Sequence, residues 1–216
     1  MKTKKLIILI LISFLFVNIS DAQNNKEQEN TPKDTLFYLN GEKEIVSNYK
    51  FSEDGIILTY LNKKGKEKEV DIDYLFAIVN ADGTKKIVYK PSDNDEDTLT
   101  VEEMGFFVRG GQEAREKYKA RLAFVEGFVV GVASPFGVLA TIGNPFYTPI
   151  LPAVNSTVIG LTIPSSKKIQ KRYPELSKNK LFVEGYKEAG RQKRVKHSIF
   201  GGIGGILTGI LIIAIL

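Results

Sequence analysis

Cysteine and tryptophan are absent from the 216-residue chain, and the only histidine is His197. Without cysteine the chain can form no disulfide framework, no thiolate metal site and no cysteine nucleophile. A single histidine cannot build a multi-histidine metal site, and its place before the last apolar run favours a role at the flank of a helix. These absences favour a protein without a metal centre or a cofactor.

Motifs for catalysis are lacking as well. The sequence contains neither a glycine-rich phosphate loop nor a nucleophile elbow. Residues 93–97 show the alternating acids of a calcium loop, but Thr98 and Met104 stand where that loop needs a glycine and a bidentate glutamate. A solvated acidic loop is the better interpretation, and we expect the protein not to be an enzyme.

Positive charge is modest overall and concentrated in one segment. The formal net charge is +5, and it falls to +3 without residues 1–22, because those residues carry three lysines and one aspartate. This excess is too small to predict nucleic-acid binding. Residues 167–196, in contrast, hold eleven Lys or Arg and three Glu. Such a segment beside apolar helices predicts contact with anionic lipid headgroups, so membrane lipid is an expected partner and nucleic acid is not.

The first 22 residues have the three parts of a secretory signal peptide. Three lysines among the first five residues precede the apolar residues 6–17, and residues 20–22 form a small-residue cleavage site. The apolar run is too short to cross a hydrocarbon layer of about 30 Å. We expect cleavage before Gln23, export of the remaining chain, and a flexible polar linker over residues 23–33.

Residues 34–109 predict a small β domain within an α+β fold. Turn-forming pairs such as Asn40–Gly41 and Asp54–Gly55 separate short runs of strand-forming residues, which is a strong hairpin signal. The expected strands cover residues 35–39, 44–51, 56–61, 67–72, 75–79 and 86–89. They predict an antiparallel meander or a small SH3-like or Sm-like barrel. Because both faces are partly apolar, we expect another element to cover the second face.

Residues 110–216 predict a helical membrane module, and Gly110 and Gly111 mark the expected change to helix. Residues 122–142 carry one charge and residues 198–216 carry none, so both stretches are long and apolar enough to span a membrane. The rest of the chain is too small to bury a helix that is apolar all round. Residues 146–164 are also uncharged, but their three prolines favour a re-entrant, interfacial or packed connector.

The two apolar stretches predict a hairpin of antiparallel spans. If the β domain is exported, the first span enters from outside and residues 167–196 lie inside, in agreement with the positive-inside tendency. The alternative uses residues 146–164 as a third span and places the basic segment outside. Prolines and charge bias both favour the hairpin, although the basic residues that precede residue 122 weaken the argument from charge.

Glycines recur at every fourth position in both apolar stretches. Gly127 and Gly131 share one helical face, and Gly201, Gly205 and Gly209 share another. Small residues at this spacing allow two helix backbones to approach closely, which predicts a glycine zipper. The simpler alternative is that glycine is common in membrane helices.

A weak repeat accompanies these glycines. Residues 110–127 and 185–202 each contain a glycine, a Glu-Ala pair, a basic helical turn and a glycine in the following apolar stretch, at an offset of 75 residues. Either a true repeat or chance similarity between two amphipathic lead-ins explains this match.

Glu126 is the one ionisable residue within the first apolar stretch. An acid inside the membrane is costly and suggests a role in proton or cation handling. It follows Arg121 by little more than one helical turn, however, and at that depth it could remain at the interface at little cost. Both interpretations stay open.

Several of these features occur together in one known group of proteins. They are a signal peptide ending in Ala-Gln, the segment Asp-Thr-Leu-Phe-Tyr-Leu-Asn-Gly at residues 34–41, a strand pair around residues 70–73, and a Gly-x-Glu-Ala helix with glycine-rich apolar stretches. With these features the chain resembles uncharacterised exported, membrane-associated proteins of Bacteroidota. The resemblance implies structural motifs and no catalytic residues.

Together these patterns predict a membrane-anchored protein of the cell envelope with its β domain outside the cytoplasm. The β domain is expected to bind an envelope protein or to act as a scaffold, and the glycine-bearing helices to anchor the chain or to form a homo-oligomer. The alternative is a small oligomeric channel or transport accessory protein, on the basis of Glu126 and the glycine faces. A hydrolase or transferase has no supporting motif.

Overall fold

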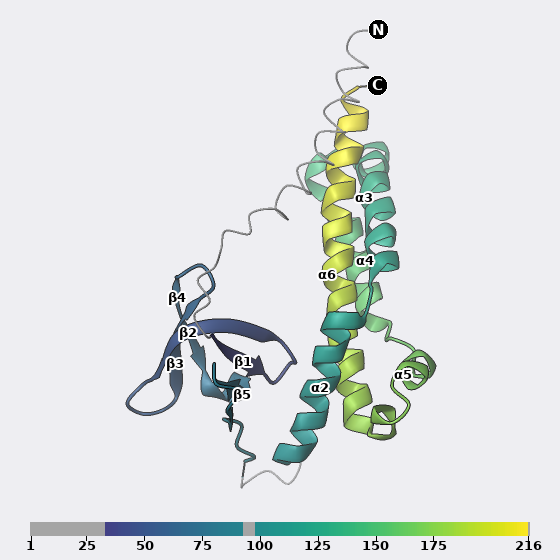
Figure 1. Ribbon diagram of the computed structural model, residues 1–216. Coiled ribbons are helices and arrows are strands. Elements are labelled where there is room, and N and C mark those ends of the chain that lie inside the picture. The colour runs from purple at the N-terminus through teal and green to yellow at the C-terminus, as the bar shows by residue number, and fades with distance from the viewer. Residues whose placement is uncertain (1–32, 93–97, 216) are drawn as a thin grey trace. The chain divides into compact units, whose positions relative to one another are not determined.

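Residues 33–92 and 98–215 are described by the computed structural model (Figure 1). The predicted signal peptide, the linker up to residue 32 and the acidic residues 93–97 lie outside this range. The described chain is α+β, as predicted, with an antiparallel sheet followed by helices.

The sheet has six strands in the order β4-β3-β2-β1-β5-β6, and every neighbouring pair is antiparallel. The strands are β1 (Asp34–Tyr38), β2 (Lys43–Phe51), β3 (Ile57–Asn62), β4 (Glu67–Asp71), β5 (Leu75–Val79) and β6 (Lys85–Ile87). A single turn of 3-10 helix, η2 (Ile72–Tyr74), leads from β4 at one side of the meander to β5, which pairs with β1. The sheet is not closed, so the predicted antiparallel meander is confirmed and the closed barrel is not formed.

Four glycines with positive φ make the tight turns between consecutive strands. Gly41, Gly55, Gly65 and Gly83 have φ between 70° and 86°, a region that residues with a Cβ rarely occupy. Each lies in one of the turns expected from the sequence. The turn chemistry therefore explains why the predicted strand boundaries agree closely with the observed ones.

Both faces of the sheet are covered by apolar packing. On one face Leu36, Leu58 and Ile78 are fully buried in the core of the β domain. On the other face Phe76 packs with Val108, which belongs to helix α2 (Val101–Lys117). The expectation that another element covers the second face is confirmed, and that element is α2.

Helix α2 begins earlier than the sequence analysis predicted. Thr100 accepts a hydrogen bond from the Glu103 amide, and the Glu103 side chain accepts one from the Thr100 amide, which together form a capping box. Gly110 and Gly111 lie inside α2 and do not start the helical part. The change to helix therefore comes at Val101, earlier than the predicted position at Gly110.

Four further helices follow α2. They are α3 (Arg121–Thr141), α4 (Ile150–Leu161), α5 (Ser166–Arg172) and α6 (Lys180–Ile213), with single 3-10 turns η3 (Pro145–Tyr147) and η4 (Leu176–Lys178). The second predicted apolar stretch is thus the C-terminal half of one long helix whose N-terminal half is basic.

Helices α3 and α6 run side by side in the same direction (Figure 1). Gly127 faces Ser198, and Gly131, one turn further along α3, faces Gly202, one turn further along α6. Helix α4 runs in the opposite direction, because its early residue Pro152 approaches Gly202 and its late residue Gly160 approaches Val195. The predicted antiparallel hairpin is therefore wrong: residues 150–161 form a helix that returns beside α6.

Within the described chain, α3 and α6 are long and apolar enough to cross a membrane. The segments Pro145–Leu161 and Ser166–Arg172 pass the same test only as a pair bent by 60°. By length and composition the chain thus offers two spans, or three if the bent pair counts as one.

Candidate functional site

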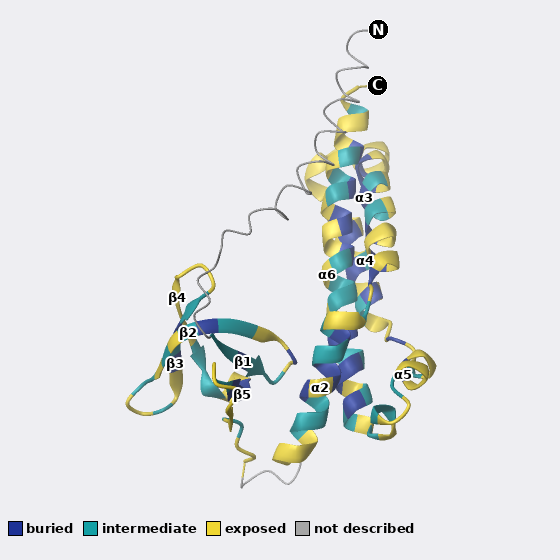
Figure 2. Cartoon of the chain, viewed as in Figure 1, coloured by how far each residue is buried: buried dark blue, intermediate teal, exposed yellow. Residues whose placement is uncertain are grey.

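The apolar helices have small residues at their buried positions and large apolar residues at many exposed ones. Figure 2 shows how buried and exposed positions are distributed along these helices. Leu122 is 77% exposed and Phe146 82% exposed. Other large outward-facing residues are Val125, Val129, Leu139, Ile150, Val154, Leu161, Phe200, Ile203, Leu207 and Leu211. The buried positions are held mainly by glycine, serine, alanine and proline. This distribution is the reverse of that in a water-soluble helical bundle and is typical of helices packed in lipid.

The structure places the five predicted glycines in the contact between α3 and α6. A Cβ on Gly127 would overlap the carbonyl of Ser198, and one on Gly201 would overlap the carbonyl of Phe124. Gly131 and Gly205 repeat this reciprocal relation one turn further along, and Gly209 continues it toward the C-terminus. The two glycine faces therefore meet each other within one chain.

The same reciprocal contact occurs between α2 and the basic half of α6. A Cβ on Gly110 would overlap the carbonyl of Phe182, and one on Gly185 would overlap the carbonyl of Phe107. Each residue of this contact differs from its counterpart by 75 positions, the offset of the weak sequence repeat. The first parts of the two similar segments thus lie against each other.

Buried hydroxyl groups connect α4 to α6, and α3 to the segment that precedes α4. The Ser156 and Ser198 hydroxyls lie 3.0 Å apart between α4 and α6, and the Asn155 amide donates to Ser198 at 3.3 Å. The Ser134 hydroxyl of α3 donates to the Thr148 carbonyl at 2.5 Å. Hydrogen bonds between helices are favourable in an apolar environment because the alternative is an unsatisfied polar group.

Glu126 lies on the exposed face of α3 and not in the contact with α6. It lines a cavity together with Lys119, Lys168 and Arg194. Within residues 33–92 and 98–215 its carboxylate forms no ion pair. Glu126 therefore lies beside basic residues close to the start of α3, at the boundary of the apolar surface.

A polar cluster on the β domain was not found from the sequence. The Glu44 carboxylate accepts hydrogen bonds from the Tyr60 hydroxyl at 2.8 Å, the Tyr38 hydroxyl at 3.2 Å and the Lys68 ammonium at 3.0 Å. Burial opposes ionisation of Glu44, but these hydrogen bonds and the Lys68 charge outweigh it and hold the pKa of Glu44 below its usual value. Burial also raises the pKa of Tyr38.

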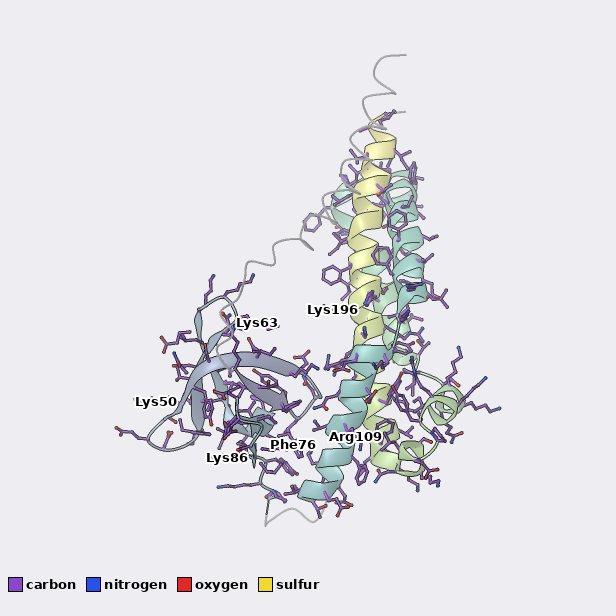
Figure 3. The ribbon with its side chains drawn as sticks, viewed as in Figure 1. Lys50, Lys63, Phe76, Lys86, Arg109 and Lys196 are labelled. Atoms are coloured by element: carbon purple, nitrogen blue, oxygen red, sulfur yellow. The ribbon has the colours of Figure 1, made fainter. Side chains whose placement is uncertain are left out.

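This cluster borders a cleft of about 920 Å³ that is also lined by α2 and α6. Two ion pairs cross from the β domain to α2 nearby, Lys43 with Glu116 at 2.5 Å and Glu42 with Arg115 at 3.1 Å. Lys196, which also lines the cleft, lies on α6 between the basic and apolar halves of that helix (Figure 3). Such exposed ion pairs contribute at most about 1 kcal/mol each to stability, so they orient the β domain more than they hold it.

The described residues do not form a metal site. Across residues 33–92 and 98–215, no group of three or more His, Asp or Glu side chains could hold a metal ion. The glycine contact, the cavity near Glu126 and the cleft near Glu44 are therefore the features on which a functional interpretation rests. No family model matches the chain, and comparisons with curated proteins and with solved structures find no match.

Proposed function

We propose that the chain is a membrane-anchored protein of the cell envelope whose β domain, outside the cytoplasm, binds a partner or acts as a scaffold. The observation that carries this proposal is the outward-facing surface of large apolar residues on α3, α4 and α6. In water a surface of this extent would aggregate, whereas lipid covers it at no cost.

Length and charge agree with insertion of these three helices. Helix α3 has 21 residues. This corresponds to about 31 Å, close to the thickness of a hydrocarbon core of about 30 Å. Residues 127–164 and 198–215 carry no charged side chain. Charged residues precede both ranges and follow the first, at Glu126, Lys167 and Lys196. Helix α4 has only 12 residues, about 18 Å, so it fills less of the core than its neighbours.

The parallel course of α3 and α6 has a consequence for topology. Both helices leave the same side, so the β domain, α2, α5 and the basic half of α6 all remain there. Residues 142–149, which connect α3 to α4, lie at or near the opposite side of the membrane, and they contain no charged residue. Insertion from the β-domain side therefore carries no charged residue through the bilayer.

Export of the β domain rests on the signal-like N-terminus. In the parallel arrangement residues 167–196 accompany the β domain, so the positive-inside tendency and the signal peptide now favour opposite orientations. We infer that the signal peptide determines the orientation of the chain, because it is the first segment to leave the ribosome. In addition, the positive-inside tendency does not apply to proteins of the outer membrane. The basic segment then meets headgroups on the outer side.

A small apolar patch on the β domain is suited to contact a protein partner. Ile56 is 51% exposed and Tyr74 67% exposed, and the Ile72 amide donates to the Ile56 carbonyl, which brings their segments together. Exposed aromatic and aliphatic residues of this kind are enriched at the centre of protein interfaces. The channel alternative has less support, because Glu126 faces away from the contact between α3 and α6.

Fractionation of a bacterial host that produces the full chain tests the anchoring. We expect the protein in the membrane pellet, resistant to alkaline carbonate and released by detergent. A photo-crosslinking residue at position 74 should then capture a neighbouring protein, whereas the same residue at Lys63, in a charged turn, should not. Recovery of the chain in the soluble fraction would contradict the proposal.

A further inference from the structure

A cavity of about 600 Å³ lies where the apolar helices meet the basic part of the chain. Its walls come from the junction of α2 and α3, from α5, and from the basic half of α6. Its lining includes five basic residues and one acid, Glu126. The basic residues are Lys117, Lys119, Lys168, Arg172 and Arg194.

Most of this positive charge is not neutralised. The Arg172 guanidinium donates to the Lys117 carbonyl at 3.2 Å, which orders one wall of the cavity. In the part of the chain that the structure describes, Lys119, Lys168 and Arg194 form no ion pair. Like charges held together from separate elements repel each other, and an anion between them would remove that cost.

The same cavity has an apolar side. Leu122 and Ile163, 77% and 59% exposed, line it and belong to the outward apolar surface of the helices. Ile169 and Tyr186 are buried at the same site. A ligand that fits this lining carries a negative charge next to a hydrocarbon chain.

We propose that this cavity binds the phosphate of an anionic phospholipid, with the acyl chains lying against Leu122 and Ile163. The inference rests on the proposed membrane attachment and adds a specific headgroup site to it. A free phosphate would use only the basic residues and leave the apolar side exposed to water, which is why the lipid is the assigned occupant. Glu126 lies at this site as the one opposing charge, so Glu126→Gln should tighten the binding.

The test uses the full chain purified in a neutral detergent, with phosphatidylglycerol or phosphatidylcholine added to the micelles and bound lipid counted by native mass spectrometry. The double variant Lys168→Gln/Arg194→Gln removes two lining cations. The control Lys167→Gln/Lys180→Gln removes the same charge at positions that do not line the cavity. Each basic residue near an anionic surface contributes about 1 kcal/mol, so the lining variant should bind phosphatidylglycerol on the order of thirty-fold more weakly than the control.

Three results would overturn the inference. They are equal binding of phosphatidylglycerol by the two double variants, equal binding of phosphatidylcholine and phosphatidylglycerol by the unchanged chain, and displacement of the lipid by inorganic phosphate at equal concentration. Failure of the headgroup site is separable from failure of the anchor, since a chain that lacks the site still fractionates with membranes.

Discussion

At the five glycines in the contact between α3 and α6, the absence of a side chain permits the observed packing. Gly205 faces the Phe128 carbonyl and the Val132 amide of α3 so closely that an added Cβ would overlap both. A Cβ added to the adjacent Gly204 would meet only the Phe128 ring, at an ordinary van der Waals distance of 3.8 Å. The same substitution by alanine at these two adjacent glycines therefore meets backbone atoms at Gly205 and only an ordinary side-chain contact at Gly204.

Gly205→Ala should destabilise the chain relative to Gly204→Ala by about 1–3 kcal/mol, the usual cost of overpacking. Both changes remove the helix-propensity penalty of glycine, about 1 kcal/mol, so this gain cancels in the comparison. Unfolding of both variants in detergent, followed by helical circular dichroism, measures the difference. Equal stability of the two variants would show that α3 and α6 do not pack through this face.

The sequence alone predicted the glycine faces but not the cluster around Glu44. The glycine faces were visible because a spacing of four is a property of one helix, although the sequence did not show which surface they meet. The cluster around Glu44 was not visible, because Tyr38, Tyr60 and Lys68 come from three other strands and only the strand register brings them together.

At the scale of elements, local signals predicted the strands well and the first helix poorly. Glycine after a polar residue marked each hairpin, since the backbone itself needs positive φ there. The pair Gly110 and Gly111 predicts a break, but Gly110 lies in the helix because it packs against the Phe182 carbonyl of α6. The capping box at Thr100 and Glu103 was the sequence signal for the true start.

Thr100→Ala should therefore lower the free energy of unfolding by about 1 kcal/mol, since it removes the side chain that caps α2. Thr100→Ser keeps a hydroxyl at the same position and should leave stability nearly unchanged. Chemical denaturation of both variants in detergent checks this. A loss as large in the serine variant as in the alanine variant would mean that the methyl group, and not the cap, matters.

At the scale of the whole molecule, the direction of the helices could not be derived from composition. The prolines in residues 146–164 argued against a straight spanning helix. A short helix still forms, because Pro149 precedes α4 and Pro152 lies in its first turn, where no amide partner is lost. Pro164 follows the end of the helix. Helix α4 therefore forms, returns beside α6, and makes α3 and α6 parallel.

Cysteine labelling tests most directly whether all charged parts of the described chain lie on the β-domain side of the membrane, as we propose. The chain has no cysteine, so single cysteines at Lys64, at Ser177 and after Leu216 can be labelled with an impermeant thiol reagent on intact spheroplasts. We predict that positions 64 and 177 are both labelled and that the C-terminal cysteine is not. Labelling at position 64 and at the C-terminus, without labelling at position 177, would restore the antiparallel hairpin and contradict this account.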